Sequence, residues 1–268
     1  MRVLVNGAET ATLAALDRGL QYGDGLFETI AVHGGRPRLL ALHLERLQDG
    51  CARLGIPPPQ RSLLEREIAA VIPAAEAVVK IIVTRGGGGR GYRVPDTSAA
   101  TRVVAAFPPP AHPAEYRGQG VRVRTCRTPV ATSPALAGIK HLGRLEHVLA
   151  RSEWRDETVA EGLMLDVAGR VVCGTQSNVF AVRGGALCTP RLDQSGVAGI
   201  MRRAVLQWAA GRCIVTRETE LRPADLHTAD EVFLTNALIG AWPVAEIDAH
   251  PLARGPLATE FLAWLDAI

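Results

Sequence analysis

A run of prolines near the middle of the chain, Pro108-Pro-Pro-Ala-His-Pro113, constrains the fold more than any other feature. Proline fixes one backbone torsion and donates no amide hydrogen bond, so neither a helix nor a central strand continues through this segment. A chain of 268 residues has enough length for two modest domains. The sequence therefore predicts a smaller N-terminal domain over residues 1–107, a linker over 108–119 and a larger C-terminal domain over 120–268.

Strand and helix patterns occur on both sides of this linker. Residues 2–5 and 29–32 precede Asn-Gly and Gly-Gly turns and are predicted to form hairpin strands. Residues 39–54 show helical spacing of apolar side chains and end at Gly55. Further strands are predicted at 78–84, 102–107, 121–126, 162–166 and 231–235, and further helices at 62–72, near 199–210 and from 257. Tight turns join the first strands, so we predict an α+β fold.

Composition argues against several functions. The net charge is only +3, the arginines are scattered and aromatic residues make up 4%, so no nucleic-acid partner is expected. The five cysteines are widely spaced without a Cys-x-x-Cys pair, which predicts reduced thiols and no metal site. Neither a membrane-spanning apolar run nor a signal peptide is evident, so no membrane association and a cytoplasmic location are expected.

Lysine is rare in this chain and therefore informative. Of thirty basic residues only two, Lys80 and Lys140, are lysines. A lysine amine can lose its proton and attack a carbonyl, which the permanently charged arginine cannot do. Lys140 precedes Leu142, Leu145, Val148 and Leu149 at helical spacing, so we expect it at the start of an amphipathic helix. A solvated surface lysine is the alternative, and the Lys-poor background favours the chemical interpretation.

Three segments are candidates for binding phosphate. Two glycines precede a predicted helix in Ser195–Arg202, where free backbone amides attract anions. Leu234–Gly240 follows a strand and offers a hydroxyl and an amide, and Arg46 could grip a phosphate with two donors. Taken singly, the two glycine-containing segments are better explained as ordinary turns, and the alternative for Arg46 is a solvated helix face. The Gly-rich loop Thr84–Tyr92 could bind carboxylates, but it lacks the Lys-Ser/Thr of a nucleotide-binding loop.

Several motifs together resemble those of the fold-type IV pyridoxal-phosphate enzymes. The first, Asp17-Arg-Gly-Leu-Gln-Tyr-Gly-Asp-Gly-Leu-Phe-Glu28, is shared with the D-amino acid and branched-chain aminotransferases. Three others resemble the aminodeoxychorismate lyases: Arg90-Gly-Tyr92, Ile139-Lys-His-Leu-Gly-Arg-Leu-Glu146 and Thr189-Pro-Arg-Leu-Asp-Gln194. The resemblance covers nearly the whole chain. It implies a two-domain α+β fold with the cofactor between the domains, and a homodimer.

The resemblance also assigns roles to individual residues. It implies that Lys140 holds pyridoxal 5'-phosphate covalently and acts as the catalytic base. Arg46 and the segment at Gly199 and Ile200 are expected at the phosphate, together with Thr235 and Asn236. Asn178 matches an asparagine that these enzymes keep beside the cofactor. At position 173 the family usually has a glutamate that pairs with the pyridine nitrogen, whereas this chain has Cys173. A neutral thiol would weaken the electron sink and disfavour transamination.

The substrate implied by the resemblance is aminodeoxychorismate, which the lyases convert to pyruvate and 4-aminobenzoate for folate biosynthesis. It has two carboxylates, so cations are expected in the pocket. The candidates are Arg90, Arg93 and Arg144, with Tyr92 as a hydrogen-bond donor. Two alternatives stay open: a D-amino acid or branched-chain aminotransferase of the same fold, and a noncatalytic protein that binds pyridoxal phosphate.

Overall fold

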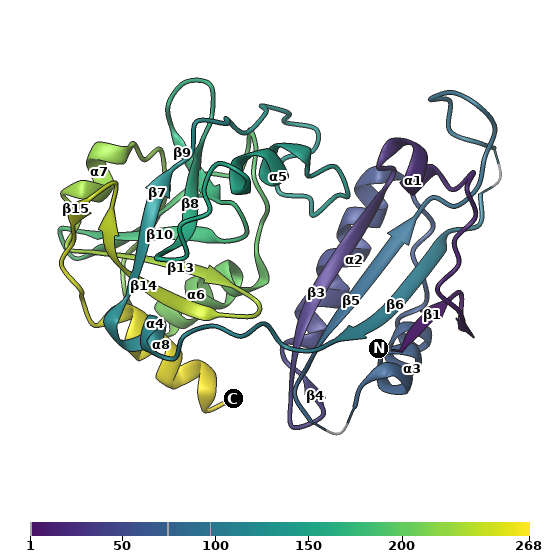
Figure 1. The fold of residues 1–268 in the computed structure, drawn as a ribbon, viewed down its shortest axis with the longest axis horizontal. Coiled ribbons are helices and arrows are strands. Elements are labelled where there is room, and N and C mark those ends of the chain that lie inside the picture. Colours follow the sequence, from purple (N-terminus) through teal and green to yellow (C-terminus); the bar gives the residue numbers. More distant parts are fainter. Residues whose placement is uncertain (1, 74, 97) are drawn as a thin grey trace. The chain divides into compact units, whose positions relative to one another are not determined.

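The computed structural model describes residues 2–73, 75–96 and 98–268, and it divides into two compact units (Figure 1). The first unit runs to Ala111 and also includes Ile139–Gly143. The second comprises His112–Gly138 and Arg144–Ile268. Lys140 therefore belongs to the first unit, whereas the sequence placed it in the C-terminal domain. The reason is strand pairing, because residues 139–143 align along a strand of the first unit.

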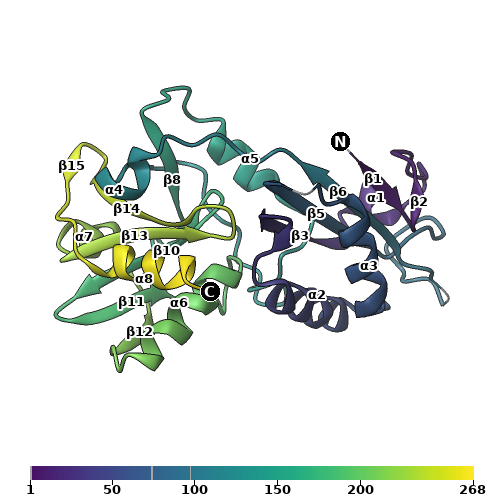
Figure 2. The same ribbon diagram turned by 90° about the horizontal axis from the view of Figure 1, so that it is seen from below.

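The first unit is built on a six-stranded antiparallel sheet with strand order β2-β1-β6-β5-β3-β4. Its strands are Val3–Val5 (β1), Ala8–Glu9 (β2), Gly25–His33 (β3), Arg36–Pro37 (β4), Ala77–Thr84 (β5) and Thr101–Phe107 (β6). Its helices are Arg18–Tyr22 (α1), Leu40–Leu54 (α2) and Arg61–Val71 (α3). Figure 2 shows α2 and α3 on the same face of this sheet. The strands and both longer helices predicted in this half of the chain are confirmed, with ends that differ by a few residues.

Alternation along β3 explains how this unit is packed. Leu26, Ile30 and Val32 are buried on the face that meets α2 and α3. These helices contribute Leu44, Leu47, Leu64 and Ile68 to the same core. Helix α2 ends where Gly55 adopts a left-handed φ of 60°, as its glycine predicted. Glu28 occupies a core-facing position of β3 and is 1% exposed, so a carboxylate lies within an otherwise apolar face.

The second unit contains a nine-stranded mixed sheet with strand order β12-β11-β10-β13-β14-β7-β8-β9, to which β15 is added at β14. Its strands are Val121–Thr125 (β7), Val159–Leu165 (β8), Val171–Gly174 (β9), Asn178–Arg183 (β10), Ala186–Pro190 (β11), Thr216–Thr219 (β12), Glu231–Asn236 (β13), Gly240–Ile247 (β14) and His250–Pro251 (β15). Its helices are Glu115–Gln119 (α4), Leu145–Arg151 (α5), Ile200–Gly211 (α6), Pro223–His227 (α7) and Leu257–Asp266 (α8). Short helix α4 lies in the segment predicted as a linker.

Apolar side chains of β10, β13 and β14 form the centre of this unit, including Val179, Val232, Leu234 and Val244. Phe180 and Phe233 stack with ring centroids 5.1 Å apart. Glu231 accepts hydrogen bonds from the backbone amides of Leu257 and Ala258 and so caps α8. This sheet fixes the ends of β9, β10 and β13, where several of the predicted cofactor residues lie. None of the helices in the described ranges is long and apolar enough to cross a membrane.

Candidate active site

Lys140 lies in an extended segment that pairs with β3. The Phe27 amide donates to the Lys140 carbonyl at 3.1 Å, and the Leu142 amide donates to the Gly25 carbonyl at 3.0 Å. Gly25 permits this approach, because a Cβ there would lie 2.9 Å from Leu142 Cδ1 and 2.5 Å from a backbone oxygen of β5. The expected helix begins only at Leu145, so the prediction that Lys140 lies at its start is wrong. Backbone pairing with β3 holds the lysine in an extended conformation instead.

Both lysines of the chain face the same aromatic ring. Lys140 Nζ lies 4.1 Å from the centroid of Phe27, and Lys80 Nζ lies 5.4 Å from it. Lys80 is on β5 directly opposite Thr29 of β3. A cation over a ring face is attracted by the ring quadrupole, which restrains both amines near this side of β3. Geometry alone therefore leaves two amines at one place in the first unit, and the motif around Lys140 distinguishes them.

Glu28 joins β3 to α2 through two partners. Its Oε2 lies 2.6 Å from Nδ1 of His43, and both residues are 1% exposed. Arg46 binds the same carboxylate with two donors, including an Nε–Oε1 distance of 2.8 Å. A bidentate pair fixes the plane of the guanidinium, so Glu28 orients Arg46. The sequence carried a signal for this arrangement, because Glu28 interrupts the apolar alternation between Leu26 and Ile30.

Both burial and neighbouring charges change the pKa values of Glu28 and His43. Burial raises the pKa of Glu28, but the charge of Arg46 and the hydrogen bonds of His43 and Arg46 outweigh it, so the pKa is lowered. Burial also lowers the pKa of His43, against the opposing effect of Glu28, and the charges of Arg46 and Lys140 lower it further. The network therefore holds an ionised carboxylate beside a guanidinium, with a neutral imidazole as the second partner.

A second group of predicted residues meets at the ends of β10 and β13. Asn178 is the register partner of Thr235 on the neighbouring strand. The Asn178 side-chain amide donates to the carbonyl of Val197 at 2.9 Å, which holds the loop before α6 against β10. Gly199 is required here, because a Cβ would lie 2.0 Å from Asn178 Oδ1. The strand pairing and the loop thus bring Asn178, Thr235, Gly199 and Ile200 into one group.

This group fits an anion. The Oγ1 of Thr235 is buried, and among the described residues it has no hydrogen-bond partner. A buried hydroxyl without a partner is unfavourable unless a ligand or water supplies one. Gly199 is the N-cap residue of helix α6 and provides no side-chain cap for the first amides of the helix. The amides of a first helical turn have no partner within the helix, and together with a buried hydroxyl they suit the phosphate of a cofactor.

Asn236 has a different role from the other residues that were predicted to bind the phosphate. Its Oδ1 accepts hydrogen bonds from the backbone amides of Leu238 at 2.8 Å and Ile239 at 3.0 Å. The side chain therefore closes the turn between β13 and β14. Its oxygen helps to fix the end of β13 and with it the position of Thr235.

Glu161, a carboxylate that the sequence analysis did not identify, holds the turn that precedes Asn178. Glu161 on β8 is buried and accepts hydrogen bonds from the hydroxyls of Thr175 and Ser177, and from the amide of Thr175. Gly174 is needed in the same turn, because a Cβ would lie 2.1 Å from Ser177 Oγ. Glu161 thus holds the turn that leads into β10, and no local motif distinguishes it from other glutamates in the sequence.

Cys173 lies on β9 opposite Met164 and belongs to a small apolar cluster with Cys126 and Trp154. It is 4% exposed. Burial raises the pKa of its thiol to about 12, and the charge of Glu161 acts in the same direction. The thiol is therefore neutral at physiological pH. At the position where the resemblance implies a glutamate, this chain therefore has an uncharged side chain.

The predicted substrate residues occur in two places. Arg90, Tyr92 and Arg93 lie together in the loop between β5 and β6, and Tyr92 is 86% exposed. Arg93 forms an exposed ion pair with Asp96 at 3.6 Å. Arg144 immediately precedes α5 in the second unit and is half-buried. Within the described parts of the chain, no cluster of His, Cys, Asp and Glu is suited to a metal ion.

Residues 25–247 match the amino-transferase class IV family, and the chain therefore belongs to it. Its fold is that of the fold-type IV enzymes, and the family consists of pyridoxal-phosphate enzymes. A crystal structure of 4-amino-4-deoxychorismate lyase from Pseudomonas aeruginosa is 47% identical in sequence, with a TM-score of 0.94. That match covers 99% of this chain and 98% of the lyase.

Curated relatives include both lyases and aminotransferases. An aminodeoxychorismate lyase of Vibrio harveyi is 36% identical over 246 residues, which is 91% of each chain. A putative branched-chain-amino-acid aminotransferase of Methanocaldococcus jannaschii is 34% identical and covers 93% of this chain and 89% of its own length. The family is thus shared by enzymes with different reactions, and the choice between them depends on the site.

Proposed function

We propose that this protein is a pyridoxal-phosphate-dependent lyase that converts 4-amino-4-deoxychorismate to 4-aminobenzoate and pyruvate, a reaction of folate biosynthesis. The observation that carries the cofactor assignment is the buried Thr235 hydroxyl, which has no partner among the described residues and belongs to the same group as Gly199. The lyase-like motifs around Lys140 and Tyr92 and the similarity to lyases support the reaction.

Several of the predicted residues would hold the cofactor. Lys140 would bind it covalently, and Arg46, oriented by Glu28, would contact its phosphate. Thr235 would donate its hydroxyl to the same group, as would the backbone amides at the start of α6. Asn178 would position this phosphate site through its hydrogen bond to the Val197 carbonyl. Asn236 would position it by closing the turn after β13. When bound, the cofactor supplies an electron-withdrawing ring that stabilises negative charge developing on the substrate.

Lys140 then has two tasks in the reaction. Its amine first acts as the nucleophile that holds the cofactor. With the cofactor bound, the Lys140 amine would remove the proton from the substrate ring carbon that bears the nitrogen. The same amine carries a proton to the departing enolpyruvyl group, which leaves as pyruvate. Phe27, whose ring lies 4.1 Å from Nζ, restrains the amine near one place during both transfers.

Cys173 supports the lyase over the aminotransferase assignment. Its neutral thiol supplies no negative charge to stabilise a protonated pyridine nitrogen, which transamination requires more strongly. Loss of pyruvate leaves an aromatic ring, so aromatisation itself favours the lyase reaction. Cys173 packs in an apolar cluster, where it can be a neutral replacement for the usual glutamate.

A pyruvate assay tests the proposal directly. Purified protein with pyridoxal phosphate should release pyruvate and 4-aminobenzoate from enzymatically made aminodeoxychorismate without an amino acceptor. The second candidate is an aminotransferase, which the similarity to such enzymes and the shared Glu28 motif favour. Steady transfer of the amino group of D-alanine or leucine to 2-oxoglutarate, without pyruvate release from aminodeoxychorismate, would establish that alternative. A protein that binds the cofactor but catalyses neither reaction would be noncatalytic.

We also propose a homodimer that covers the apolar face of α5. Leu145, Val148 and Leu149, which the sequence showed at helical spacing, are 78%, 62% and 58% exposed. Such a contiguous apolar stripe on a helix is a common feature of protein interfaces. Val148→Asp should therefore shift the protein from dimer to monomer in light scattering after size exclusion. A monomeric wild-type protein would contradict the proposal.

A further inference from the structure

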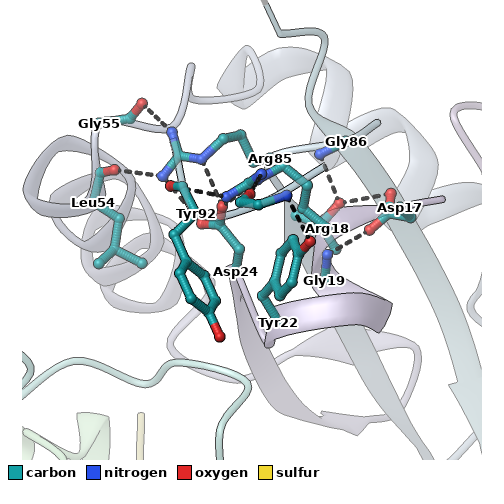
Figure 3. Close-up of polar contacts among 12 residues, drawn as sticks. Asp17, Arg18, Gly19, Tyr22, Asp24, Leu54, Gly55, Arg85, Gly86 and Tyr92 are labelled. Atoms are coloured by element: carbon teal, nitrogen blue, oxygen red, sulfur yellow. Dashed lines mark hydrogen bonds and ion pairs between the residues drawn. The ribbon is translucent and has the colours of Figure 1, made fainter. Parts of the chain in front are cut away.

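Two buried arginines of the first unit share one carboxylate. Asp24 accepts from Arg18 Nε at 2.9 Å and from Arg85 Nε at 2.8 Å, as Figure 3 shows. The side chains of Arg18 and Arg85 are 4% and 5% exposed. A single carboxylate neutralises only one of two buried cations, so the remaining donors of both arginines need other acceptors. These acceptors differ, and the difference assigns the two residues separate roles.

Arg85 uses its remaining donors on a helix end. Its Nη1 donates to the carbonyl of Gly55 at 2.7 Å, and its Nη2 donates to the carbonyl of Leu54 at 2.8 Å. These carbonyls lie at the C-terminus of α2, where a cation satisfies unpaired acceptors and interacts favourably with the helix dipole. Arg85 therefore stabilises the packing of α2.

Arg18 instead binds the loop between β5 and β6. Its Nη1 donates to the carbonyl of Gly91 at 2.9 Å, and its Nη2 lies 3.5 Å from the carbonyl of Tyr92. The backbone amide of Arg18 also donates to the carbonyl of Gly86 at 2.9 Å, at the start of this loop. The loop packs on the aliphatic stem, because a Cβ at Gly88 would lie 3.1 Å from Arg18 Cδ.

Tyr22 also binds the loop between β5 and β6. Its hydroxyl accepts a hydrogen bond from the Gly91 amide at 3.2 Å. Its ring lies under the Arg18 guanidinium at 4.9 Å and meets the ring of Tyr92 edge-on, with centroids 5.4 Å apart (Figure 3). Both the backbone and the ring of Tyr92 are thus restrained, although 86% of this residue is exposed. Such fixed exposure of a large aromatic side chain suits contact with a ligand.

We infer that Arg18 is a positioning residue that, with Tyr22, clamps the loop of residues 86–93 and presents Tyr92 and Arg90 to the substrate. The part about the substrate rests on the proposed function, whereas the clamp itself does not. Without the clamp the loop would sample many conformations, and binding would have to order it again. The expected consequence is weaker substrate binding with little change in the chemical step.

Limited trypsin digestion and steady-state kinetics of the full-length enzyme with pyridoxal phosphate test this inference. Trypsin cleaves after Arg90 and Arg93 within the loop, and mass spectrometry identifies these cuts. Arg18→Met should accelerate cleavage at both sites and raise KM for aminodeoxychorismate by roughly tenfold, with kcat within about threefold. Tyr22→Phe removes only the acceptor for the Gly91 amide and should act in the same direction, more weakly. If Arg18→Met does not fold, the cleavage rate of Tyr22→Phe alone tests whether the clamp exists.

Arg85→Met is the matched control, because Arg85 binds the same Asp24 but contacts α2 instead of the loop. It should lower the thermal midpoint without changing loop cleavage or KM. Unchanged cleavage in Tyr22→Phe and in folded Arg18→Met would refute the clamp. Faster cleavage with unchanged KM would refute the link to substrate. A wild-type enzyme that releases no pyruvate would refute the proposed function and this link, while the cleavage rates would still decide whether the clamp exists.

Discussion

Replacing Thr235 by valine should separate cofactor binding from folding. The hydroxyl is completely buried and has no partner among the described residues. An unsatisfied buried hydroxyl costs about 1–3 kcal/mol, and valine has nearly the same shape without the polar atom. Thr235→Val should therefore stabilise the cofactor-free protein by about 1 kcal/mol, which raises the unfolding midpoint by about 2 °C in a protein of this size.

The effect on cofactor binding should have the opposite sign. A hydrogen bond from a hydroxyl to a charged phosphate contributes about 1.5–3 kcal/mol, so Kd for pyridoxal phosphate should rise roughly 10- to 100-fold. Thr189→Val is the matched control, because Thr189 is equally buried and its hydroxyl donates to the Val179 carbonyl at 2.8 Å. It should destabilise the protein by about 1 kcal/mol and leave Kd unchanged.

The two measurements are thermal unfolding of cofactor-free protein and titration with pyridoxal phosphate followed by absorbance. If Thr235→Val destabilises the protein as much as Thr189→Val and leaves Kd unchanged, the argument from the buried hydroxyl fails. Thr235 would then have a partner within the protein, and the phosphate would have to bind elsewhere.

Three further predictions concern other parts of the molecule. Borohydride reduction should fix the pyridoxyl group to the peptide containing Lys140, and Lys140→Arg should lower turnover by several orders of magnitude; label on Lys80 would contradict the assignment. Cys173→Ala should leave pyruvate release nearly unchanged, whereas Cys173→Glu should add transamination of amino acids but lower the thermal midpoint, because it buries a second carboxylate near Glu161. Loss of pyruvate release in Cys173→Ala would instead give the thiol a direct role. Burial raises the pKa of Asp24, but hydrogen bonds from Arg85 and Arg18 and their charges lower it below its usual value near 4. Because the stability from such a group is present above its unfolded pKa and lost as pH falls through its folded pKa, Asp24→Asn should cost about 2 kcal/mol or more at pH 7 and progressively less below about pH 4. A penalty in urea unfolding that stays constant from pH 7 to pH 3 would contradict this account.

The local sequence was sufficient for most helices and strands. Helix α2 and its end at Gly55 follow from apolar spacing and a glycine in a left-handed conformation. The rarity of lysine and the motif around Lys140 together predict the candidate catalytic residue. These signals are readable because they depend on neighbours a few positions away along the chain.

The apolar spacing after Lys140 was misleading in one respect. It predicted a helix beginning at the lysine, but residues 139–143 pair with β3, more than a hundred positions earlier in the chain. The spacing does indicate an apolar face, and Leu145, Val148 and Leu149 of that face are exposed. Periodicity reports that one face is apolar, and it does not report what covers that face.

The tertiary structure decided which polar groups share partners. Glu28 meets Arg46 across eighteen positions, and Arg18 reaches the Gly91 carbonyl across seventy-three. The Thr235 hydroxyl, which has no partner in the part of the chain that the structure describes, and the contrast between Arg18 and Arg85 are equally invisible in the sequence. Each depends on which distant acceptors surround a buried donor. Burial removes water as a partner, so the energetic consequence of each polar side chain is determined by the neighbours that folding places around it.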